Sequence, residues 1–215
     1  MVGRAVLNPL NYAPAVRALF RALDLWVVDD IAPPASAYPR FADRTLTTPD
    51  HAGWPPIPGY EFPMHPLRAF HLNFGPDWSK GIVSVEPPEI GKPFAVRVPA
   101  VDADGNALGG IRLPEITVPL ATYAGWNYRD KSIGAPHQNA GEIGSYLPFS
   151  RTRVDREHSG DPRPSIEERY RNRDEYLGKY AAAALMLVQK RYLLAEDVAD
   201  LLNHAADHYD WAVRP

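Results

Sequence analysis

The 215-residue chain contains no cysteine. Disulfide bonds, thiolate metal sites, iron–sulfur clusters and cysteine nucleophiles are therefore excluded. The chain also lacks an apolar run near the roughly 20 residues that a membrane-spanning helix requires. Its first ten residues lack the apolar core and the cleavage site of a signal peptide. These absences predict a soluble protein with no membrane partner, located by default in the cytoplasm.

An excess of positive charge is missing as well. The formal net charge is −3, and the isoelectric point is close to 6.2. The densest basic stretch, residues 169–173, is interrupted by Tyr and Asn and is followed by Asp174 and Glu175. This pattern is typical of the solvated start of a helix. The sequence therefore predicts no nucleic-acid partner.

Motifs for catalysis and cofactor binding are also absent. No G-x-S-x-G elbow, which would expose a nucleophilic serine, occurs in the chain. Ser79 lacks the leading glycine and Ser145 directly follows Gly144, so we interpret both serines as turn residues. The pair Gly109-Gly110 lacks the spacing and the Lys-Ser/Thr ending of a phosphate-binding loop. The sequence predicts no catalytic residue and no cofactor.

Two patterns that could bind metal are incomplete. His204 and His208 are spaced i, i+4 on the last expected helix, but no third ligand is obvious nearby. We therefore favour an exposed helix flank over a metal site for this pair. Residues 102–106, DADGN, resemble the start of a calcium loop. The glycine and glutamate that such a loop needs are replaced by Ala107 and Leu113, so a hairpin turn is the better interpretation.

Proline is abundant, with 23 residues in the chain, about twice the usual frequency of roughly 5%. Many of these prolines lie between Pro33 and Pro66, where neither a helix nor a central strand is compatible with them. We predict a long loop over residues 33–69. A loop of this length is uncommon inside a compact domain, so we expect it to wrap over a larger body.

The remaining segments predict an α+β chain, either a single domain or part of one. Val16, Leu19, Phe20, Leu23 and Val27 repeat at helical spacing and form the apolar face of an N-terminal amphipathic helix. Capping patterns and apolar periodicity predict helices at 174–190 and 196–209, joined by a short link as an antiparallel pair. Extended segments at 70–74, 82–85, 94–101, 108–113 and 116–123 predict a small irregular antiparallel sheet. The expected order is a helix in 1–32, the Pro-rich loop in 33–69, the β region in 70–127, a loop in 128–164 and the C-terminal helices in 165–211.

One irregular stretch, residues 109–127, combines polar groups with aromatic side chains. Such a combination is typical of ligand sites, so Arg112, Glu115, Tyr123, Trp126 and Asn127 are candidate pocket-lining residues. The alternative is an internal ion pair between Arg112 and Glu115, with Tyr123 and Trp126 packed in the core. We favour this alternative, because buried aromatic residues contribute first to the core.

The amino-acid sequences of several segments resemble the C-terminal part of a large bacterial family of alpha/beta-hydrolase-domain proteins. The resemblance extends from about Asn8 to Trp211, and the segments that resemble the family most are residues 8–12, 109–127, 144–151 and 161–170. It implies an ester- or amide-type hydrolase whose nucleophile, acid and histidine would all lie upstream of these phrases. No catalytic residue can therefore be transferred to this chain.

The resemblance also implies a partner. The helix at residues 16–27 is similar to the last core helix of the family, which would pack on a parallel sheet. We therefore expect its apolar face to be covered by a missing N-terminal hydrolase core or by a second copy of the chain. The alternative function is an independent, non-catalytic binding or protein-interaction module that uses the Pro-rich loop and the aromatic stretch as its surface.

Overall fold

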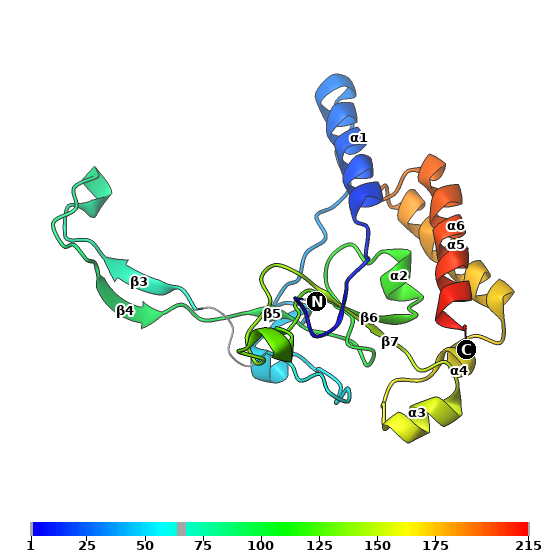
Figure 1. The fold of residues 1–215 in the computed structure, drawn as a ribbon. Coiled ribbons are helices and arrows are strands. Elements are labelled where there is room, and N and C mark those ends of the chain that lie inside the picture. Colours follow the sequence, from blue (N-terminus) through cyan, green and yellow to red (C-terminus); the bar gives the residue numbers. More distant parts are fainter. Residues whose placement is uncertain (1, 64–67, 215) are drawn as a thin grey trace.

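The computed structural model describes residues 2–63 and 68–214 and shows the α+β architecture that the sequence predicts (Figure 1). A body of small sheets and C-terminal helices carries two projections. The helix α1 (Ala13–Asp29) rises from the body, and a long hairpin extends from another side. Within the described residues, no helix has the length and apolar character needed to cross a membrane.

The central sheet has three antiparallel strands in the order β1-β7-β6. They are β1 (Val6–Leu7), β7 (Ser145–Pro148) and β6 (Ala121–Ala124), with Tyr123 opposite Tyr146. Two antiparallel pairs lie outside it: β2 (Leu46–Thr47) with β5 (Val98–Pro99), and β3 (Phe70–Asn73) with β4 (Glu89–Pro93). The sheets are small and irregular, as predicted.

Several expected strands differ from those observed. Residues 82–85 form no strand, and β3 pairs instead with β4. Residues 108–113 are irregular. The segment 116–123 is divided between the short helix α2 (Pro114–Thr117) and β6, because Pro114 is well placed in the first turn of a helix. The turn at 102–106 does form, with the Asp102 amide donating to the Asn106 carbonyl at 2.9 Å.

The C-terminal helices form the predicted antiparallel pair, α5 (Arg173–Gln189) and α6 (Val198–Ala212). Two short helices precede them, α3 (Arg153–Ser159) and α4 (Ile166–Arg169). The capping box at Ser165 is confirmed. The Ser165 hydroxyl accepts a hydrogen bond from the Glu168 backbone amide, and the Glu168 carboxylate accepts one from the Ser165 backbone amide. The segment 128–164, expected to be a loop, contains β7 and α3. Single-turn 3-10 helices occupy Pro49–His51, Trp78–Lys80, Lys131–Ile133 and Ala195–Asp197.

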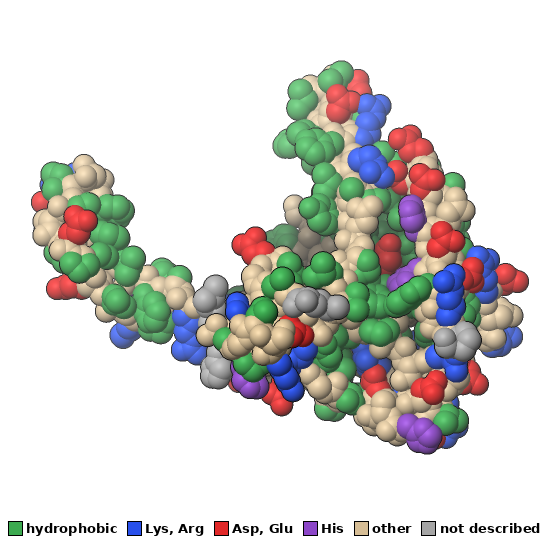
Figure 2. Space-filling view, viewed as in Figure 1, with side chains coloured by type: hydrophobic (Ala, Val, Ile, Leu, Met, Phe, Trp, Pro, Cys, Tyr) green, Lys and Arg blue, Asp and Glu red, His purple; other side chains and the backbone are tan. Residues whose placement is uncertain are grey.

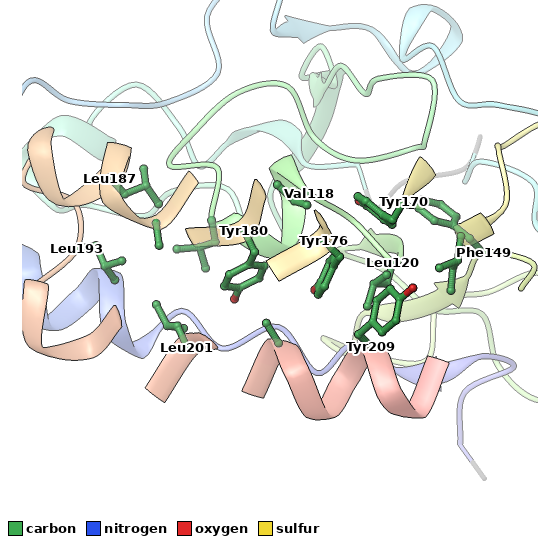
Figure 3. Close-up of a cluster of buried hydrophobic side chains, with 14 of the residues drawn as sticks. Val118, Leu120, Phe149, Tyr170, Tyr176, Tyr180, Leu187, Leu193, Leu201 and Tyr209 are labelled. Carbon is green, nitrogen blue, oxygen red and sulfur yellow. The ribbon is translucent and has the colours of Figure 1, made fainter. Parts of the chain in front are cut away.

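The main core lies where α5, α6 and α2 meet the strand region. Figure 3 shows it as a row of large side chains between α5 and α6. Tyrosines dominate one end: Tyr176 stacks on Tyr209 at 5.1 Å and meets Tyr170 edge-on at the same centroid distance. Leu187, Leu193 and Leu201 continue the core toward the link between the two helices, whereas Leu120 and Phe149 lie at the tyrosine end. Burial of this apolar surface stabilises the helix pair.

The helix α1 contacts the body mainly through its small residues. Ala15, Ala18 and Ala22 are buried, whereas its bulky side chains are exposed. Phe20 is 68% exposed and Val27 is 76% exposed. Figure 2 shows hydrophobic side chains gathered along one side of this projecting helix. The apolar face that the sequence predicts is therefore present, and within the described residues nothing covers its large members.

The second projection is the β3–β4 hairpin. All residues of both strands are exposed, including Phe70, Leu72 and Ile90. Figure 1 shows this arm extending away from the body. The Pro-rich loop precedes it, and its described part runs over the body, where Ala52 and Ile57 are buried. Residues 64–67 of that loop lie outside the described part of the chain.

Candidate functional site

A pocket of about 440 Å³ lies among α2, β6, α5, α6 and the segment that leads into α1. This volume lies within the range of about 300–1,000 Å³ that small-molecule sites usually have. We call it the tyrosine pocket. Its walls combine apolar, aromatic and titratable side chains: Pro9, Leu10, Asn11, Glu115, Tyr123, Tyr176, Tyr180, Leu201, His204, Ala205 and His208.

Regular secondary structure places the polar side chains of the tyrosine pocket. Tyr176 and Tyr180 are spaced i, i+4 on α5, so both lie on the face that meets α6. His204 and His208 have the same spacing on α6. Figure 3 shows Tyr176 and Tyr180 directed from α5 toward α6, with both hydroxyls at the α6 side. Side chains from distant parts of the sequence thus converge on rigid elements.

Glu115, in α2, is the acidic group of the tyrosine pocket. Its Oε2 atom is buried and has no hydrogen-bond partner among the described residues. Burial raises the pKa of this carboxyl, and its own backbone amide, the Tyr180 hydroxyl and the nearby His204 offset the rise only in part. The carboxyl is therefore held in an environment that disfavours its charge and leaves one oxygen free for a ligand.

A tyrosine–histidine pair borders the same pocket. The Tyr146 hydroxyl and the His208 Nε2 atom share a hydrogen bond at 2.6 Å. Burial lowers the pKa of His208 below its usual value of 6.5 and raises the pKa of Tyr146. His208 is therefore neutral at pH 7, and the pair is an uncharged hydrogen-bonding unit rather than an ion pair.

The tyrosines of the pocket are neutral as well. Burial is the main cause that raises the pKa of Tyr123, Tyr176 and Tyr180, and the charge of Glu115 raises each of them further. These three phenol side chains line the same pocket as the Glu115 carboxyl. The pocket can thus offer hydroxyl groups, aromatic rings and a single acidic group to a ligand.

The raised pKa of Glu115 predicts a pH-dependent stability. Because the folded state holds the Glu115 proton more tightly than the unfolded chain, this group favours folding below its unfolded pKa, and the contribution is lost as the pH rises through the folded pKa. The Glu115→Gln variant has no carboxyl to titrate at this position, so it lacks this loss of stability with rising pH. Its melting temperature relative to the wild type should therefore increase between about pH 5 and about pH 8.

A matched control is Glu157→Gln on α3, where the Arg153 side chain lowers the pKa of an exposed carboxylate. That carboxylate is ionised in both states across this pH range, so its variant should show a constant difference from the wild type. A difference for Glu115→Gln that is equally constant would contradict the assigned pKa shift.

The structure brings some of the sequence candidates together and separates others. Glu115 and Tyr123 line the tyrosine pocket, and the tertiary fold adds His204 and His208 to them. His204 is exposed and its Nδ1 atom lies 2.8 Å from the Asp200 carbonyl oxygen. Within the described residues, no three His, Asp or Glu side chains cluster as a metal site would require.

Arg112, Trp126 and Asn127 lie elsewhere. Arg112 pairs with Asp102 at 2.6 Å rather than with Glu115, and Trp126 packs on Trp54 at a centroid distance of 5.2 Å. Asn127 is fully buried and exchanges hydrogen bonds with both backbone groups of Ala5, at 3.1 Å each. These hydrogen bonds hold the N-terminal segment against the sheet.

Sequence reasoning missed Tyr176 as a site residue, although two tyrosines spaced i, i+4 on one apolar face are a usable signal.

A second, larger concavity follows the Pro-rich loop and has a volume of about 1220 Å³. We call it the aromatic groove. Its aromatic walls are formed by Trp54, Tyr60, Phe62 and Tyr128, and its charged or titratable positions are Arg4, Asp50, Glu61, Lys131 and His137. Trp54, Phe62 and Trp126 form a contiguous aromatic cluster beside it, with centroid distances of 5.2–6.2 Å. This groove is open and combines aromatic side chains with charged groups of both signs.

Comparison with known proteins identifies one family. The family described as alpha/beta hydrolase domain matches residues 3–203. The matched region includes the central sheet, α1, α5 and most of the tyrosine pocket, and it ends within α6. No match was found among the curated proteins or among the solved structures.

Proposed function

This chain belongs to the alpha/beta hydrolase domain family, and we propose that it is the C-terminal, non-catalytic part of an ester- or amide-directed hydrolase. In this proposal the chain supplies a structured cap and the tyrosine pocket, while a separate hydrolase core supplies the nucleophile, its histidine and the acid. Family membership supports the class of reaction. The exposed apolar face of α1 supports the proposal that the catalytic groups belong to a separate hydrolase core.

The face of α1 is the observation that carries the proposal. Phe20, Leu23, Trp26 and Val27 are all exposed, and they follow one another along the same helix. A continuous apolar surface of this kind is unusual on a soluble monomer and marks a contact with another chain or domain. A hydrolase core, which covers its sheet with amphipathic helices, is a partner that fits such a face.

The serines of the chain also support the proposal. The Ser145 hydroxyl is fully buried and donates to the Trp126 carbonyl at 2.7 Å, so it holds the sheet in place. Ser79 is exposed on the 3-10 turn at the end of the hairpin arm. Among the described residues, no serine hydroxyl forms a hydrogen bond with an imidazole, which is the pairing that activates a serine nucleophile.

An esterase assay tests whether the chain is catalytically silent alone. We expect the purified chain to hydrolyse p-nitrophenyl acetate at the rate given by its surface groups, with Ser79→Ala and Ser145→Ala indistinguishable from the wild type. The physical reason is that neither hydroxyl has a base to accept its proton. Turnover that exceeds this background and is abolished by one serine substitution would refute the proposal.

The second candidate function is an independent, non-catalytic binding module. The aromatic groove favours it, because Trp54, Phe62 and Tyr128 provide a ready contact surface within this chain alone. The DNA upstream of the coding region separates the two functions. A coding region for a G-x-S-x-G elbow, in frame or shifted, supports the hydrolase part; an unrelated gene supports the binding module.

A further inference from the structure

The tyrosine pocket contains one polar atom that the chain itself leaves unused. The Oε2 atom of Glu115 is buried without a hydrogen-bond partner among the described residues. An unpaired buried acceptor costs about 1–3 kcal/mol, and more if the group is charged. A ligand that donates a hydrogen bond to this atom would remove that cost on binding.

The charged groups that line the pocket determine which sign of charge such a ligand should carry. Neither lysine nor arginine is among the lining residues, so Glu115 is the only lining group that can be charged over a wide pH range. His208 is neutral and bound to Tyr146, and Arg112 is directed to Asp102. The Glu115 carboxylate would repel an anionic ligand, whereas a cation would pair with it.

The aromatic walls fit a cation as well. Tyr123, Tyr176 and Tyr180 line the pocket together with Glu115 and supply it with aromatic rings and neutral hydroxyl groups. Aromatic rings attract organic ammonium ions through the negative potential of their faces, and the attraction is strongest where water is excluded. The hydroxyl oxygens can accept the remaining N–H bonds of such an ion.

The geometry points to a binding site for a small organic ammonium ion, which we propose is held by Glu115 through an ion pair and by Tyr123, Tyr176 and Tyr180 through their rings and hydroxyls. The volume of about 440 Å³ accommodates a single ring with a short amine arm. The apolar part of the ligand would contact Leu10, Leu201 and Ala205. This inference does not depend on the proposed hydrolase partnership, because every group it uses lies in this chain.

Isothermal titration of the full chain with benzylammonium and cyclohexylammonium tests the site, with benzyl alcohol and benzoate as the uncharged and anionic counterparts of the first. At about pH 8 we expect both amines to saturate one site, the alcohol to bind at least tenfold more weakly, and benzoate not to bind. A tenfold difference corresponds to about 1.4 kcal/mol, which is within the range of a charge-assisted hydrogen bond.

The Glu115→Gln variant should weaken benzylammonium at least tenfold and leave benzyl alcohol unchanged. The matched control is Glu157→Gln, an exposed carboxylate on α3 that is not among the lining residues and should have no effect. If Glu115→Gln fails to fold, Tyr180→Phe and the wild type at several pH values replace it. The wild-type affinity for benzylammonium should rise with pH as Glu115 loses its proton, with Tyr123, Tyr176, Tyr180 and His204 as the other groups that face it.

Three results would overturn the inference. The first is that benzyl alcohol binds as tightly as benzylammonium. The second is that the affinity for benzylammonium changes neither with pH nor in the Glu115→Gln variant. The third is that neither amine shows saturable binding up to about 10 mM, beyond which a site of this kind has no specificity. None of these results bears on catalytic silence or on the face of α1, so a failure here is distinguishable from a failure of the proposed function.

Discussion

Replacing Arg163 with methionine is expected to destabilise the fold by about 3–5 kcal/mol, the usual cost of removing one partner of a buried ion pair. Arg163 is only 3% exposed and pairs with Asp161, with Nη2 and Oδ2 2.5 Å apart. The same guanidinium donates to Thr122 Oγ1 at 2.7 Å and to the Leu147 carbonyl at 2.9 Å. Methionine fills much of the volume but removes every side-chain hydrogen bond of Arg163 and leaves the buried Asp161 carboxylate with only the backbone amide of residue 163.

Chemical denaturation of Arg163→Met measures this loss, with Arg153→Met on α3 as the matched control. Arg153 forms an exposed pair with Glu157, so its replacement should change the free energy of unfolding by less than about 1 kcal/mol. Adding Asp161→Asn to Arg163→Met should recover part of the loss, because the unpaired charge is removed. Equal effects for Arg163→Met and Arg153→Met would show that the buried network does not hold the central strands to the segment that enters α4.

Replacing both Phe20 and Trp26 of α1 with glutamate is expected to abolish association through this helix. Large aromatic side chains at an interface each contribute about 2 kcal/mol or more, which is roughly thirtyfold in a dissociation constant. Both side chains are more than half exposed, so the variant should melt near the wild-type temperature. Sedimentation velocity over a concentration series measures the association.

The control for this variant is Arg21→Gln, which lies on the polar side of the same helix and pairs with Asp24. It should leave the association unchanged. Loss of association in the control as well, or an unchanged sedimentation profile in the double variant, would contradict the role assigned to the apolar face of α1.

The helices were predictable because their signals are local. The apolar repeat of α1, the capping box at Ser165 and the periodicity of α5 and α6 all lie within a few residues of one another. The arm was not predictable in the same way. All residues of β3 and β4 are exposed, so no alternation between buried and exposed positions marks their pairing, and the expected strand at 82–85 was wrong.

The candidate site was predictable only in part. Glu115 and Tyr123 were named as candidates because polar and aromatic residues occur together in an irregular stretch, although an internal ion pair and core packing were the favoured interpretation; both residues line the tyrosine pocket. The partner of Arg112 was not, since the choice between Asp102 and Glu115 depends on how the turn at 102–106 folds back. The addition of His208 depends on the packing of α6 against Tyr146, 62 residues earlier in the chain. Contacts over such separations leave no pattern in one sequence.

The central claim is that the apolar face of α1 belongs against another polypeptide. Gel filtration with light scattering, combined with binding of a hydrophobic dye, tests it on the wild-type chain without any variant. We predict self-association or strong dye binding, because Phe20, Trp26 and Val27 remain in contact with water in the isolated chain. A monodisperse monomer that binds no dye would contradict the claim.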